Sequence, residues 1–195
     1  MSIDPSPLIE RYVQNLRDLD VPVMRCLNSA LTRDEVEHII RSRHPHPPEE
    51  IPDEYYEWFS WHNGFDVAYI SQQQRVAADL DPAGNELSSL EWMMMFLEMR
   101  DVSAPDYWDR PLLPLFRDTG GYSTALLADG DEWHMYYVGK DSDVWLPLDH
   151  HYRSQPSLED PTPTLRRWIT SLCDGMERGK LVLNEFATWD VLDWE

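Results

Sequence analysis

Apolar residues recur every three or four positions in five segments of the chain, which is the spacing of a helix with one buried face. The first predicted helix starts after Ser6, which can cap it, and has Pro7 in its first turn. The second starts within LTRDEVEHII, where Thr32 and Glu35 have the spacing of a capping box. These segments predict that the fold begins with helices.

The stretch IPDEYYEWFSWHNGF, residues 51–65, holds six aromatic side chains in fifteen positions. Pro52 suits the first turn of a third helix, and Asn63-Gly64 suits the left-handed conformation that ends one. At helical spacing, one face of this segment carries Tyr55, Trp58, Phe59 and His62. The aromatic density therefore predicts an anchor in the core rather than the lining of a ligand site.

Two more helices are predicted further along the chain. SSLEWMMMFLEMR has Ser88 and Glu91 as another capping box, and its three consecutive methionines are typical of core filling. The last helix starts near Thr162-Pro163 or Thr164 and ends near Gly179. Its apolar residues share one face, as expected for a helix packed on a sheet.

Short runs of β-forming residues predict strands, and loops rich in Asp, Gly and Ser separate them. The runs are FDVAYI (65–70), LLPLF (112–116), YSTALLA (122–128), WHMYYVG (133–139), DVWLPLDHHY (143–152) and a terminal LVLNEF (181–186). The close spacing of the four central runs predicts an antiparallel meander. The predicted class is therefore α+β, with an antiparallel sheet of about four to six strands and helices packed against it.

Net charge changes the functional picture most. The chain has 16 Lys and Arg against 36 Asp and Glu, a formal net charge of −20. Residues 1–100 and 101–195 share this excess equally, so it is spread along the fold. Such a surface repels nucleic acid and anionic lipid, and it attracts a basic protein at a salt-sensitive rate. A simple requirement for solubility explains the same charge, and that alternative stays open.

The length of 195 residues suits one domain, and no run of about 18 apolar residues predicts a membrane span. The N-terminus lacks the basic-then-apolar order of a secretory signal. With Cys26 and Cys173 as the only cysteines, neither a disulfide framework nor a zinc knuckle is predicted. We therefore expect a cytoplasmic protein.

Few residues have a pattern that carries chemistry. His44-Pro45-His46 and Asp149-His150-His151 each bring two imidazoles close in sequence, but neither has the ligand set of a zinc site. The motifs GxSxG, GxxxxGK[ST] and GxGxxG are absent. The sequence therefore predicts no catalytic residue, no metal and no cofactor. An enzyme with its site around His150 and His151 is kept as an alternative.

The turns of the predicted meander are acidic and have aromatic neighbours. Alternate turns of a meander lie at the same edge, so some of these acids are expected to form one negative patch with aromatic anchors. The predicted partner-binding residues are Asp118, Tyr122, Asp129, Asp131, Glu132, Asp141, Asp143 and Trp145. For any single aspartate, turn closure is the competing explanation.

The order of the motifs adds to this picture. LTRDEVEHII is followed by a hydrophobic-Pro, helix, Asn-Gly pattern, with Ile51, Pro52, Asn63 and Gly64 in its diagnostic positions. SSLEWMMMFLEM, LLPLFRDTGGYSTALLADG, DVWLPLDHHY and PTLRRWITSLCDGMERG then follow. In this order the chain resembles the SUKH superfamily, which includes yeast cell-wall-assembly regulators and many bacterial immunity proteins. It departs from the family at Gly121-Tyr122, where Gly-Asp is common.

The resemblance covers residues 31–180, with 1–30 as an N-terminal helical extension and 181–195 as a C-terminal extension. It implies an α+β domain without a catalytic role. In bacteria such domains bind and neutralise a toxin domain, often a nuclease, so we expect an immunity protein with a basic partner. The alternative is a regulatory scaffold of the cell-wall-assembly-regulator type. A sheet edge at 65–70 or 112–116 can also pair between chains.

Overall fold

The computed structural model describes residues 5–65, 87–103, 112–117, 123–138, 145–147, 164–184 and 189–192. In chain order its elements are α1 (Pro7–Asp18), the 3-10 helix η1 (Pro22–Arg25), α2 (Arg33–Arg43), α3 (Asp53–Phe59), α4 (Leu90–Ser103), β1 (Leu112–Arg117), β2 (Ser123–Asp129), β3 (Glu132–Val138), β4 (Trp145–Pro147), α5 (Leu165–Glu177), β5 (Leu181–Leu183) and β6 (Trp189–Val191). The predicted α+β class is confirmed.

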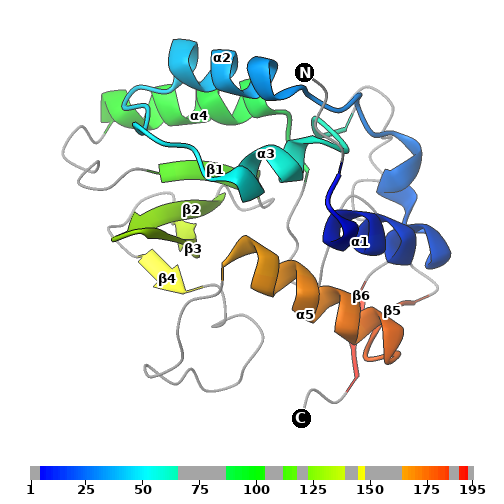
Figure 1. Ribbon diagram of the computed structural model, residues 1–195. Coiled ribbons are helices and arrows are strands. Elements are labelled where there is room, and N and C mark those ends of the chain that lie inside the picture. Colours follow the sequence, from blue (N-terminus) through cyan, green and yellow to red (C-terminus); the bar gives the residue numbers. More distant parts are fainter. Residues whose placement is uncertain are drawn as a thin grey trace.

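Strands β1 to β4 form one antiparallel sheet in the order β1-β2-β3-β4, which is the predicted meander. Strands β5 and β6 pair in a separate two-stranded ladder. Helix α2 lies along α4, and α1 lies along α5 (Figure 1). Of the predicted strand at 65–70, only Phe65 is described, and it makes an isolated bridge with Leu27.

Helix starts follow the predicted caps in three of the five helices. The hydroxyl of Ser6 accepts from the N–H of Ile9, and that of Thr164 accepts from the N–H of Arg167. Thr32 and Glu35 form both bonds of a capping box. These caps satisfy donors that a helix leaves unpaired in its first turn.

The start of α4 differs from its predicted capping box, and the prediction for Ser88 is wrong. The hydroxyl of Ser89, one residue later, accepts from the N–H of Trp92 at 3.3 Å. The carboxylate of Glu91 instead accepts from Nδ2 of Asn63 at 3.0 Å. Ser89 therefore takes the capping role that the local pattern assigned to Ser88, and Glu91 bonds a residue distant in sequence instead of closing a capping box.

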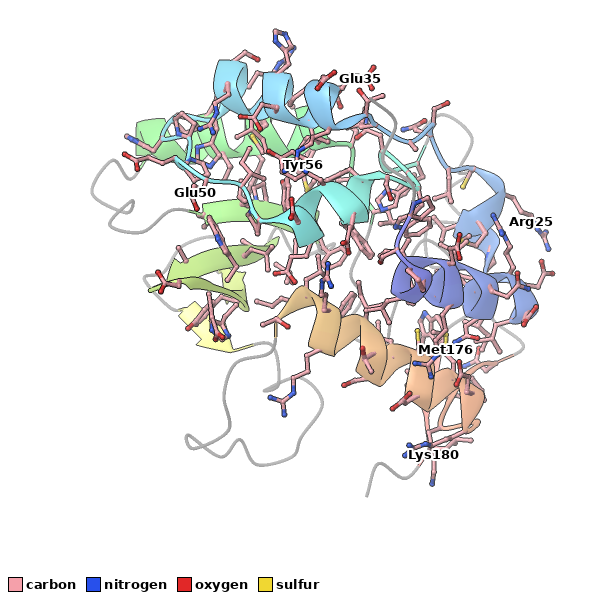
Figure 2. The ribbon with its side chains drawn as sticks, viewed as in Figure 1. Arg25, Glu35, Glu50, Tyr56, Met176 and Lys180 are labelled. Atoms are coloured by element: carbon pink, nitrogen blue, oxygen red, sulfur yellow. The ribbon has the colours of Figure 1, made fainter. Side chains whose placement is uncertain are left out.

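One hydrophobic core joins α1, α3, the sheet and α5. At its centre lies Trp58, whose ring centroid is 6.1 Å from Tyr12, 5.1 Å from Phe116 and 6.3 Å from Trp168. Met176 extends this core on α5 close to α1 (Figure 2). The predicted aromatic face is buried, with Tyr55, Trp58, Phe59 and His62 all inaccessible to solvent. The aromatic density of residues 51–65 therefore serves the core.

Residues 62–64 form a junction between α3 and α4. Helix α3 ends at Phe59, earlier than predicted, and the left-handed residue is Gly64, with φ of +69°. The N–H of Gly64 donates to Nδ1 of His62 at 2.8 Å. A Cβ on Gly64 would lie 2.4 Å from the backbone nitrogen of Ser89, so α4 packs directly against this glycine. Only glycine fits this junction.

Two side chains cover the outer edge of β1. The hydroxyl of Tyr55 donates to the carbonyl of Pro114 at 2.7 Å. Nε2 of His44 lies 2.7 Å from the carbonyl of Leu112, and the ring must donate there because a carbonyl only accepts. These two carbonyls already have donors, and Pro114 has no N–H to offer. The suggested pairing of residues 112–116 between chains therefore does not fit this edge.

Candidate protein-binding surface at the β2–β3 hairpin

The structure describes part of the predicted partner-binding set. Asp131 and Glu132 are exposed at the turn between β2 and β3. Asp129 ends β2 and Trp145 begins β4, and both are placed through their backbone. Asp118, Tyr122, Asp141 and Asp143 lie outside the described residues, as do His150 and His151.

The sheet register separates this set into two groups. Asp129 pairs with Glu132 at one end of the meander, where β2 turns into β3. At the other end Ser123 pairs with Val138, and Val138 pairs with Trp145. The seven residues of β3 separate these ends by about 20 Å. The structure therefore places Trp145 at the opposite end of the meander from Asp131 and Glu132, so the described members of the set do not all lie at one edge.

His134 of β3 links the acidic turn to helix α3. Nε2 of His134 lies 3.3 Å from the Glu132 carboxylate, and His134 also acts electrostatically on Glu54 of α3. The N-terminal ends of α3 and α5 both lie beside the meander (Figure 1). We call this surface the hairpin face, and it consists of Asp53, Glu54, Glu57, Asp131, Glu132, His134 and Arg166.

The carboxylates of α3 are unequally paired. Glu57 lies 2.5 Å from the guanidinium of Arg166, and Asp53 lies 2.8 Å from that of Arg33. Within the described part of the chain, Glu54 has no such partner, and its carboxylate accepts one hydrogen bond there, from the backbone N–H of Arg166 at a long 3.4 Å.

Burial has an effect on Glu54 that these contacts do not offset. Loss of water around the half-buried side chain raises the pKa of Glu54, while the N–H and the positive charge of Arg166 oppose this in part. The charged form of Glu54 is thus less well stabilised than in water. A cation supplied from outside would compensate it.

The hairpin face is negative overall. It has five carboxylates and one guanidinium, that of Arg166. A second guanidinium, that of Arg33, pairs with Asp53 at the rim of the face. Asp131 and Glu132 project at the exposed turn with no arginine or lysine bonded to them in the described part of the chain. This arrangement suits attraction of a basic protein surface.

The two fully described buried histidines are engaged in the fold. Nδ1 of His44 accepts from the N–H of His46 at 3.0 Å, and Nδ1 of His62 accepts from Gly64. Burial lowers the pKa of His62 to about 3 and lowers that of His44 as well. Across the described ranges, no three His, Cys, Asp or Glu side chains come together as metal ligands. No helix within those ranges is long and apolar enough to cross a membrane.

No family model matches the chain, and no curated protein matches its sequence.

The sequence did not reveal five members of the hairpin face: Asp53, Glu54, Glu57, His134 and Arg166. One signal was readable, because Glu54 and Glu57 stand three positions apart on the polar face of a predicted helix. Their approach to Arg166 joins positions 112 and 109 residues apart, and a local pattern holds no information on such a contact.

Proposed function

We propose that the protein is a non-enzymatic binding protein that neutralises a cognate toxin domain, in the manner of the SUKH immunity proteins that its motifs resemble. The observation that carries this proposal is the hairpin face, where exposed acids at a β turn adjoin a half-buried carboxylate that no arginine or lysine side chain bonds among the described residues. The partner is a basic protein domain. A nuclease is the favoured activity for it, because an enzyme that grips phosphates must display basic groups.

Binding is proposed to act by blocking rather than by chemistry. The net charge of −20 draws a basic domain toward the chain, and Asp131 and Glu132 meet its cationic side chains first. Glu54 is more buried than these two residues, and its carboxylate then pairs with a cationic side chain of the partner, which excludes water from it. Occupation of the basic surface prevents that surface from holding its own anionic substrate.

The proposal predicts a toxin gene next to the gene of this protein, and co-expression with that toxin domain is the decisive experiment. Rescue of growth and co-purification in a one-to-one complex are expected. A chain that neither rescues growth nor co-purifies would overturn the proposal. If the protein restores a regulatory process in the cell but inhibits no toxin activity, the scaffold alternative is favoured.

The salt dependence of the association rate distinguishes the proposed electrostatic steering from binding by shape complementarity alone. The association rate of the complex should fall severalfold between about 50 mM and 500 mM sodium chloride, because the Debye length shortens over this range. An association rate that does not change with salt would contradict an electrostatic contribution from the acidic surface.

A further inference from the structure

We draw no further inference here: the strongest candidate, the cluster of buried ring nitrogens in the aromatic core that have no hydrogen-bond partner in the described part of the chain (Trp58, Trp61, His62 and Trp168), carries none, because nothing in that part of the chain shows room for a ligand among these rings.

Discussion

Oδ1 of Asn63 accepts a hydrogen bond from the N–H of Leu90 at 2.8 Å, so the first residue of α4 is held by a residue 27 positions earlier. The adjacent Gly64 donates to His62, and its carbonyl accepts from the N–H of Asn28. Three stretches of chain, before α2, after α3 and at the start of α4, thus meet at two residues. The Asn-Gly pair has a structural role that its sequence context only partly suggests.

Gly64→Ala should destabilise the fold by about 3 kcal/mol or more. The added Cβ would lie 2.4 Å from the nitrogen of Ser89 in a backbone with φ of +69°, which combines a steric clash with a left-handed strain. Gly130→Ala is the matched control, because Gly130 has φ of +64° and open space around its Cβ. It should lose only about 1 kcal/mol in urea denaturation. Equal losses of unfolding free energy in the two variants would show that the contact with α4 does not contribute to stability.

Acid should destabilise the protein through His62. Its pKa is about 3 in the folded state and near 6.5 when unfolded, so the unfolded chain binds the proton more readily. The contribution of His62 is fully present above pH 6.5 and is lost as pH falls toward 3. Between pH 7 and pH 5 the loss is on the order of 2 kcal/mol, and His44 adds to it in the same direction.

Urea denaturation at several pH values tests this expectation. His62→Gln should lower stability at pH 7 but flatten the pH dependence, since glutamine does not titrate. A variant with the same slope as the wild type would rule out His62 as its source.

Tyr55→Phe should cost about 1 to 2 kcal/mol of unfolding free energy. The substitution removes the donor at 2.7 Å from the carbonyl of Pro114 and leaves that buried acceptor without its partner. Tyr136→Phe, on β3, provides a control at a partly buried tyrosine without a hydrogen bond in the described part of the chain. If both variants melt alike, the Tyr55 hydroxyl does not stabilise the edge.

Charge reversal at the hairpin should slow partner association without affecting the fold. Asp131→Lys and Glu132→Lys together are expected to reduce the association rate about tenfold at low salt. Stability should change by no more than about 0.5 kcal/mol per site, because both side chains are exposed. Glu10→Lys with Glu98→Lys gives the same change in net charge on α1 and α4. An equal slowing by that pair would mean that total charge, not the hairpin face, governs encounter.

Glu54→Gln should have opposite effects on stability and on binding. Burial raises the pKa of Glu54, so its charge costs folding free energy at neutral pH, and the neutral amide should gain about 0.5 kcal/mol. Partner affinity should fall severalfold, with faster dissociation. Glu57→Gln is the control on the same helix, and it should lose stability because Glu57 pairs with Arg166. Unchanged affinity in Glu54→Gln would remove this residue from the interface.

Local signals in the sequence predicted most of the fold. Ser6, Thr32 and Thr164 cap helices as expected because capping depends on residues within one turn. The meander followed from strand length and turn composition. The predictions failed where a distant contact replaced a local one, as when Glu91 bonded Asn63 instead of closing a capping box at the start of α4.

The candidate site was harder to predict for a physical reason. Turn composition located Asp131 and Glu132, but only the register shows that Trp145 lies at the opposite end of the meander. In the sequence, Glu54 is a negative charge in the first turn of a predicted helix, where such a charge stabilises the helix. Only the packing of α5 and β3 near Glu54 shows that no described arginine or lysine side chain bonds its carboxylate.

The close approach of Gly64 to Ser89 holds two points of the chain, 25 positions apart, side by side. The fold therefore fixes the distance between these two points, not the number of residues that connect them. A variant with a connection of another length can keep this contact, provided that glycine stays at position 64.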